Sequence, residues 1–299
     1  MNRRQFIQTT AVAASAVNFL SNHTLAAESK GVNWPIGCFN RPWSESKEKD
    51  WGLDTALDGI KAAGYKTVGL LRRQAKDPLA GSDATQEYLE GLKKRIAARG
   101  LKTNMAALRT NNSLSLEDQI KDMRKQIDNA RFLGAEFGLT FGVDSSAHFE
   151  NYYKLMQDAA PYAEEKVLKV VLKPHGGATG AAEEIARCIE KVNHRNFKIW
   201  FDAGNIIFYT GKDPVEQLKP IVRHVTGFCA KDCEKQHGTV LLEFGTGKVD
   251  FHAVFAEMKK AGFNGPVMVE CCASSATPEE ANAHVRKNRE YLQKVFESL

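Results

Sequence analysis

Short apolar segments alternate with longer amphipathic segments along most of the chain. The amphipathic segments repeat apolar residues at helical spacing; Phe251, Val254 and Met258, for example, fall on one stripe behind Asp250, a residue suited to cap a helix. The short segments are mostly apolar, which is typical of strands buried on both faces. The eight predicted strands cover Pro35–Phe39, Thr67–Leu71, Thr103–Ala107, Phe137–Phe141, Lys169–Leu172, Lys198–Phe201, Val225–Ala230 and Val267–Glu270.

A glycine follows four of the predicted helices, each time shortly before an extended segment. These glycines are Gly64, Gly100, Gly134 and Gly262, and each is suited to the left-handed position that ends a helix. The spacing of the first three matches one strand, one helix and two short loops. Eight such units, alternating strand and helix, predict an α/β fold with a single closed (β/α)8 barrel, a TIM barrel.

The main alternative fold is a doubly wound sheet that binds a dinucleotide. Its first strand is normally followed by a G-x-G-x-x-G turn, whereas here the first strand is followed by Asn40-Arg41-Pro42-Trp43. We therefore predict no nucleotide cofactor. No linker rich in Pro, Gly or Ser divides the chain, so we expect one barrel domain over residues 28–299.

Residues 1–27 have a different character. Arg3 and Arg4 precede an apolar stretch too short to span a bilayer, and small residues follow up to Ala27. This order predicts a cleaved signal peptide of the twin-arginine type and export to the periplasm, with a disordered leader as the alternative. The segment contains two arginines and no acidic residue, so its removal lowers the net charge from +5 to about +3. We expect no transmembrane helix in the remainder.

Composition excludes several classes of protein. The chain is 43% hydrophobic, and its six cysteines are unevenly spaced without a C-x-x-C pair, so neither a disulfide framework nor a zinc knuckle is expected. Lysines and arginines are not concentrated in one stripe, which disfavours nucleic-acid binding. Nothing in the sequence indicates the oligomeric state.

Polar residues gather where the last four predicted strands end. In a TIM barrel the carboxyl ends of the strands form the mouth, where active sites lie, so these side chains are expected to converge. They are Lys173, His175, Asp202, Asn205, Cys229, Lys231 and Glu270. Arg109, like Arg72 and Arg73, adds a cation that either binds a phosphate, a carboxylate or sugar hydroxyls, or is a solvated loop charge. Trp43 is our candidate for an aromatic platform beneath a sugar ring, whereas Trp200 is expected in the core.

Five motifs occur in a fixed order along the second half of the chain. They are His175-Gly176-Gly177, Asp202-Ala203-Gly204-Asn205, Lys231-Asp232, Gly245-Thr246-Gly247-Lys248-Val249-Asp250-Phe251, and Gly262-Phe263-Asn264-Gly265 followed by Glu270. Together they resemble the xylose isomerase-like TIM-barrel superfamily of sugar phosphate isomerases and epimerases. The resemblance implies a divalent metal at the barrel mouth, with Glu, Asp, His and Glu ligands from strands five to eight. It also implies proton transfer next to a sugar carbonyl.

Two of the four ligand positions implied by this resemblance are altered. Asp202 and Glu270 occupy their positions, but Lys173 stands where the family has Glu, and Cys229 stands where it has His. A protonated lysine has no lone pair and cannot bind a metal. A thiolate favours zinc over Mg²⁺ or Mn²⁺.

Two interpretations remain open from the sequence. In one, a divalent ion (Zn, Mn or Mg) is held by His175, Asp202, Glu270 and Cys229. In the other, the Lys173 ammonium replaces the metal between the two carboxylates, either as a proton carrier or in a non-catalytic descendant.

The function that we expect is an exported isomerase or epimerase that acts on a small carbohydrate. Glu270 is the expected base or ligand, Asp202 a ligand or orienting group, and Lys173 the cation or proton carrier. Close alternatives are a keto-sugar lyase or hydrolase, which begins with the same deprotonation, and a non-catalytic sugar-binding protein. The expected substrate-binding residues are His175, Asn205, Lys231, Arg109 and Trp43.

Overall fold

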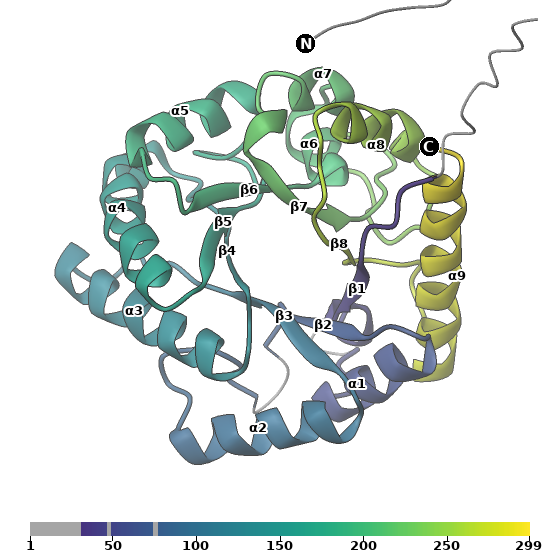
Figure 1. Cartoon of the computed structure of the whole chain (residues 1–299), viewed down its shortest axis with the longest axis horizontal. Coiled ribbons are helices and arrows are strands. Elements are labelled where there is room, and N and C mark those ends of the chain that lie inside the picture. The colour runs from purple at the N-terminus through teal and green to yellow at the C-terminus, as the bar shows by residue number, and fades with distance from the viewer. Residues whose placement is uncertain (1–30, 47–48, 74–76) are drawn as a thin grey trace, which may run out of the picture. The chain divides into compact units, whose positions relative to one another are not determined.

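The structure is a computed structural model that describes residues 31–46, 49–73 and 77–299 (Figure 1). The predicted signal peptide, residues 1–27, lies outside the described residues, so cleavage and export stay predictions.

Eight parallel strands form a closed barrel in chain order, and β8 pairs with β1 to complete it. The predicted TIM barrel is therefore confirmed, and each predicted strand boundary differs from the observed one by at most one residue. The strands are β1 (Ile36–Phe39), β2 (Thr67–Leu70), β3 (Lys102–Ala107), β4 (Phe137–Thr140), β5 (Lys169–Leu172), β6 (Phe197–Phe201), β7 (Val225–Ala230) and β8 (Val267–Val269).

Helices surround the barrel, and the last helix lies beside the first, so that they close the outer ring (Figure 1). The α-helices are α1 (Leu53–Ala62), α2 (Gln86–Ala98), α3 (Leu116–Phe132), α4 (Phe149–Glu165), α5 (Ala182–Val192), α6 (Ala203–Thr210), α7 (Pro214–Leu218), α8 (Phe251–Lys260) and α9 (Pro278–Glu297). As predicted, Asp250 caps α8, accepting a hydrogen bond from the Ala253 N–H at 2.9 Å. In the described residues, none of the helices combines the length and the apolar character needed to cross a bilayer.

The connection after β6 differs from the single helix expected there. Gly211 has φ of 68°, a left-handed conformation that ends α6, and Pro214 then begins the short helix α7. Two helices therefore occupy this interval where one was expected. The four glycines predicted to end helices, in contrast, all have positive φ, as that prediction required.

Apolar side chains fill the interior of the barrel. Trp200 is fully buried among them, which confirms its predicted place in the core. The other members of this inner cluster are Phe39, Leu71, Met105, Phe137, Leu139, Val171, Cys229 and Met268. Towards the carboxyl ends of the strands this apolar filling gives way to buried charged groups. Burial of a charge costs several kcal/mol unless it is paired, so the arrangement of these groups defines the candidate site.

Candidate active site at the barrel mouth

Four buried charged residues meet where β5, β6, β7 and β8 end, and none is more than 4% exposed. Lys173 Nζ lies 3.1 Å from Asp202 Oδ2 and also contacts Glu270 Oε2. Lys231 Nζ lies 3.2 Å from Asp202 Oδ2 and 2.8 Å from Glu270 Oε1. Each ammonium therefore bridges both carboxylates. We call Lys173, Asp202, Lys231 and Glu270 the ion cluster.

The strand order explains why these residues meet. Each of the four directly follows its strand, and the ends of neighbouring parallel strands lie at the same edge of the barrel. Asp202 has a second role, because its Oδ1 accepts the Asn205 N–H at 2.9 Å and caps α6. This cap fixes the carboxylate that both lysines share.

The environment shifts the pKa values of the two carboxylates of the ion cluster in opposite directions. Burial raises the pKa of Asp202, although both lysines oppose this effect. Burial also acts to raise the pKa of Glu270, but the two lysines and Arg41 outweigh it and hold that pKa well below its usual range. For the Lys231 ammonium, the effect of burial is likewise outweighed by the two carboxylates, which raise its pKa above its ordinary value. Glu270 and Lys231 are therefore both charged at neutral pH.

A cavity of about 290 Å³ opens above the ion cluster. Its lining is mostly polar and consists of Arg41, Leu71, Arg72, Arg109, Phe141, Lys173, His175 and Glu270. Arg109 extends over the Phe141 ring, 4.4 Å from its centroid, and donates a hydrogen bond to the Leu71 carbonyl at 2.7 Å. Lys173 and Glu270 thus face a space that a small molecule can enter.

His175 stands at the wall of this cavity, where its ring contacts the Phe141 and Tyr209 rings. The Tyr209 hydroxyl lies 3.1 Å from Nε2. Burial, followed by the charges of Lys173 and Lys231, lowers the pKa of His175 to about 3. The imidazole is therefore neutral at physiological pH and can donate to or accept from a ligand hydroxyl.

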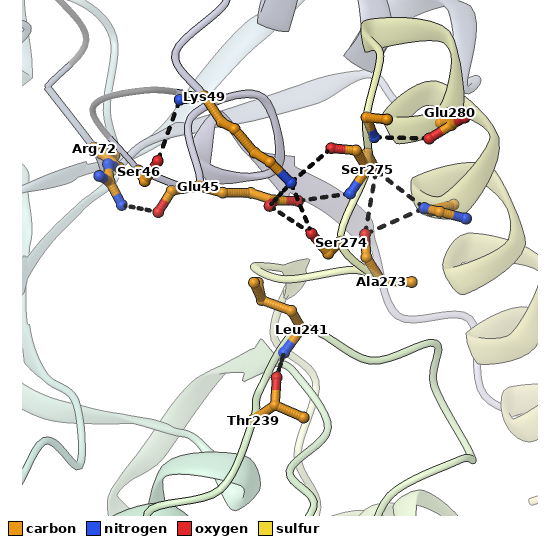
Figure 2. A network of polar contacts seen from close by, with 12 residues as sticks. Glu45, Ser46, Lys49, Arg72, Thr239, Leu241, Ala273, Ser274, Ser275 and Glu280 are labelled. Carbon is orange, nitrogen blue, oxygen red and sulfur yellow. Dashed lines mark hydrogen bonds and ion pairs between the residues drawn. The ribbon is translucent and has the colours of Figure 1, made fainter.

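A polar network beside the cavity joins the loop after β1 to the loop after β8 (Figure 2). Glu45 accepts hydrogen bonds from the Ser274 hydroxyl at 2.9 Å and from the Ser275 N–H at 3.0 Å, while Lys49 donates to Ser274 at 3.1 Å. Arg72 donates to the Glu45 carbonyl at 2.9 Å. Arg72, which also lines the cavity, is therefore connected to contacts between residues distant in sequence.

The structure corrects the expectation for Trp43. Its side chain is fully buried in the 3-10 helix η1 (Arg41–Trp43), packs against Gly59, and donates from Nε1 to Asn282 Oδ1 at 2.9 Å. A β-carbon on Gly59 would lie 2.4 Å from the indole ring, so the packing is close. Because no face of the ring is exposed, Trp43 cannot form a platform for a sugar.

Asn205 also lies outside the cavity lining. It is buried, and its Nδ2 donates to the Pro174 carbonyl at 2.5 Å, so it holds the turn after β5. Lys231, expected to bind substrate, lies in the ion cluster and pairs there with Glu270.

Asp232 organises the long loop after β7. Its two carboxylate oxygens accept backbone N–H bonds of 2.8–3.1 Å from Cys233, Gly245, Gly247 and Val249. A β-carbon at Gly247 would lie 2.3 Å from Asp232 Oδ1, which explains the glycine at that position. The Lys231-Asp232 and Gly245-to-Phe251 motifs of the sequence are therefore joined in one loop by the hydrogen bonds to Asp232.

Arg41, which the sequence reasoning did not select, belongs to the site. It follows β1 in η1, lines the cavity, and its Nη1 contacts the Cys271 thiol. A cation two positions after the end of a predicted barrel strand was the available signal. Phe141 and Tyr209 were also missed, since neither carries a charge that marks it in the sequence.

The sequence profile of the xylose isomerase-like TIM barrel family matches residues 57–295. The chain belongs to this family. Among characterised relatives it is similar to the L-ribulose-5-phosphate 3-epimerase UlaE of Salmonella choleraesuis, with 25% identity over 253 residues, 78% of this chain and 86% of the relative. It is also similar to an inosose dehydratase of Geobacillus kaustophilus, with 21% identity over 286 residues, 82% of this chain and 88% of the relative.

Solved xylose isomerase-like barrels have the same fold. A D-allulose 3-epimerase from a Methylomonas species superposes with a TM-score of 0.69 at 16% identity, covering 88% of this chain and 98% of the epimerase. A family protein from Mycobacterium smegmatis, solved in complex with magnesium, gives a TM-score of 0.69 at 16% identity, covering 89% and 97%.

The ligand positions of the xylose isomerase-like family contain donors at metal-like spacing in this chain. The carboxylate oxygens of Asp202 and Glu270 and the Sγ of Cys229 lie within 4.8 Å of one another. However, these carboxylates already contact both lysine ammonium groups, and burial raises the pKa of the Cys229 thiol well above its ordinary value. His175 is not part of this group of donors. A divalent cation next to two ammonium groups would be repelled, so the residues present do not fit the family's metal.

Proposed function

We propose that the protein is a carbohydrate isomerase or epimerase in which Lys173 and Lys231 replace the divalent metal implied by the family resemblance. The observation that carries the proposal is the ion cluster, buried at the barrel mouth and open to a cavity through Lys173 and Glu270. Membership of a family whose relatives include epimerases supports the reaction class.

The proposed first step removes a proton from the carbon next to a sugar carbonyl. A Glu270 oxygen takes the proton, and the electron pair of the C–H bond moves to the carbonyl oxygen to form an enediolate. The Lys173 ammonium, released from Glu270, stabilises the new negative charge. When substrate binds, its carbonyl oxygen draws the Lys173 ammonium away from Glu270, which keeps only one ammonium partner. The pKa of Glu270 therefore rises, and the carboxylate becomes a stronger base.

In the second step a proton returns to the enediolate by one of two routes. The Lys173 ammonium gives a proton to the same carbon from the opposite face, and Glu270 afterwards passes its own proton to Lys173; alternatively, protonated Glu270 gives its proton to the former carbonyl carbon, while the hydroxyl proton on the first carbon moves to the former carbonyl oxygen. The first outcome is epimerisation and the second is isomerisation. Neutral His175, at the cavity wall, is placed to hydrogen-bond a substrate hydroxyl and to hold the sugar during the transfer.

A lyase is the second candidate, favoured by the likeness to an inosose dehydratase. After the same deprotonation, the C–O bond at the next carbon breaks, the enediolate electrons form a double bond, and the departing hydroxyl leaves as water after it takes a proton. A non-catalytic sugar-binding protein remains the contrasting class, because each carboxylate forms ion pairs with both lysines. We further propose that residues 1–27 direct export, so that the reaction takes place in the periplasm.

Proton exchange in D₂O tests the proposal directly. Ketoses and keto-sugars are incubated with purified protein, and NMR follows loss of the proton next to the carbonyl and the appearance of new sugars. We expect wild type to exchange this proton with at least one sugar, Glu270→Gln to lose the exchange, and Glu183→Gln, a change on the exposed surface of α5, to retain it. Exchange that is unaffected by Glu270→Gln contradicts the assignment of the base, and binding without any exchange indicates a non-catalytic protein.

A further inference from the structure

The cavity above the ion cluster has an excess of positive charge. The cluster itself is formally neutral, because its two ammonium groups face two carboxylates. Besides Arg72, whose guanidinium donates to the Glu45 carbonyl, Arg41 and Arg109 add two guanidinium groups to the lining of the same cavity. Within the described residues, neither forms an ion pair with a carboxylate.

The partners of both arginines are uncharged. Arg41 contacts the Cys271 thiol, and burial raises the pKa of that thiol, so it stays protonated and neutral. Arg109 donates to the Leu71 carbonyl and lies over the face of Phe141. These contacts hold the two guanidinium groups in place without neutralising their charge.

Arginines on the outer helices and in the loops that follow them have a different environment. In the described chain, several of them pair with carboxylates even though the surrounding water reduces the benefit. The pairs are Arg95 with Asp54 and Asp77, Arg99 with Asp54 and Asp58, Arg124 with Asp158, Arg187 with Glu183, and Arg195 with Glu164. Arg41 and Arg109 differ from these arginines, because they line the cavity without a carboxylate partner in the described chain and can therefore bind an anion that enters it.

We propose that the substrate carries an anionic group, a carboxylate or a phosphate, that binds to Arg41 and Arg109 while its carbonyl end reaches Lys173 and Glu270. This inference rests on the proposed function, since it places the reacting end of the substrate at the ion cluster. Guanidinium groups bind both kinds of anion through paired hydrogen bonds. A cavity of about 290 Å³ lies at the lower end of the range for small-molecule sites, which fits a monosaccharide acid or a monosaccharide phosphate.

Calorimetric titration of the purified protein tests this inference with three probes: D-glucuronate, D-glucose 6-phosphate and D-glucose. All are measured at one ionic strength, because salt screens exposed charges. We expect at least one anionic sugar to bind about tenfold or more tightly than glucose. Arg109→Gln should remove most of this preference, and Arg109→Lys should restore part of it, because lysine keeps the charge but loses the planar fork.

Arg187→Gln provides the matched control, since it removes one positive charge from the outer surface of α5. It should bind all three sugars as wild type does. Arg41→Gln repeats the test at the second guanidinium, and circular dichroism verifies that each variant is folded. The preferred anion identifies the source of the charge: glucuronate indicates sugar acids, and glucose 6-phosphate indicates sugar phosphates.

The inference is overturned if neither anionic sugar binds more tightly than glucose, or if Arg109→Gln keeps the full preference for the anion. Its failure is separable from failure of the proposed function. Anion binding that depends on Arg109, with no proton exchange in D₂O for any sugar tested, supports the anionic ligand and contradicts the enzymatic proposal.

Discussion

Lys173 and Glu270, 97 residues apart in the sequence, form a buried ion pair across the mouth of the barrel. The pair links the end of β5 to the end of β8, at two positions where the family resemblance implies a pair of metal-binding carboxylates. A lysine in place of the first carboxylate replaces a negative charge that would attract a metal with a positive charge that neutralises Glu270. The first two predictions below follow from this contact.

Removal of the Lys173 charge should destabilise the fold. Lys173→Met leaves both carboxylates of the ion cluster to share Lys231, and loss of one partner from a buried ion pair costs about 3–5 kcal/mol. Urea denaturation of wild type and variant measures the difference. Lys121→Met, which removes an exposed lysine from its pairs with Glu117 and Asp118, should leave stability nearly unchanged. Equal denaturation midpoints for wild type and Lys173→Met would contradict the importance of the buried pair.

Metal binding should appear only after the lysine is replaced by a ligand. Wild type should keep its melting temperature when Mn²⁺ or EDTA is added, because two ammonium groups already satisfy the carboxylates. Lys173→Glu supplies a third carboxylate, so Mn²⁺ should raise its melting temperature by binding the folded state. Lys173→Gln, which removes the charge without adding a carboxylate, is the control and should respond much less. Stabilisation of wild type by Mn²⁺ or zinc would instead support a retained metal.

His175 should remain neutral well below physiological pH. Its pKa is about 3 in the folded protein, compared with about 6.5 in an unfolded chain. Between these values the unfolded chain binds a proton that the folded protein does not bind. Its contribution to stability is therefore fully present above about pH 6.5 and is lost as the pH falls towards 3.

NMR of the imidazole ring checks this prediction. The signal that disappears in His175→Gln should show no titration between about pH 5 and 8. The same variant should lose less stability on acidification than wild type does. A midpoint near 6.5 would mean that the ring is more solvated, or less affected by the lysines, than the structure indicates.

Export should depend on the paired arginines at the N-terminus. Replacing Arg3 and Arg4 with lysine should leave the precursor in the cytoplasm, and immunoblots of cell fractions measure the distribution. Unchanged export of the variant would exclude the twin-arginine route. A wild-type chain that keeps residues 1–27 would exclude a cleaved signal peptide.

The fold was accessible from the sequence because its signals are local and repeated. Apolar runs specified the strands within one residue, and glycines such as Gly64 and Gly134 marked the ends of helices. The convergence of Lys173, Asp202 and Glu270 was equally predictable. Once the strands are known to be parallel and in order, the residue that ends each one must lie at the mouth.

Features that depend on distant contacts were not accessible in this way. Trp43 follows a strand and precedes polar residues, as an exposed loop residue would, but its burial depends on Asn282, 239 positions away. Lys231 pairs with Glu270 and not with adjacent Asp232, because backbone N–H groups of the loop after β7 already donate hydrogen bonds to the Asp232 carboxylate. Sequence spacing carries no information on such competition between partners.

The attachment of the β7–α8 loop to one carboxylate has a consequence for protein engineering. Since Asp232 holds both Cys233 and Gly245, the intervening residues 234–244 form a lobe whose two ends meet at one carboxylate and whose middle contacts α6, where the His237 N–H donates to the Phe208 carbonyl at 3.0 Å. Loops on this face of a TIM barrel commonly vary between proteins with different substrates. A lobe of another length or sequence should therefore be graftable between these two anchor points without moving the charged residues below, which makes it a starting point for redesigning specificity.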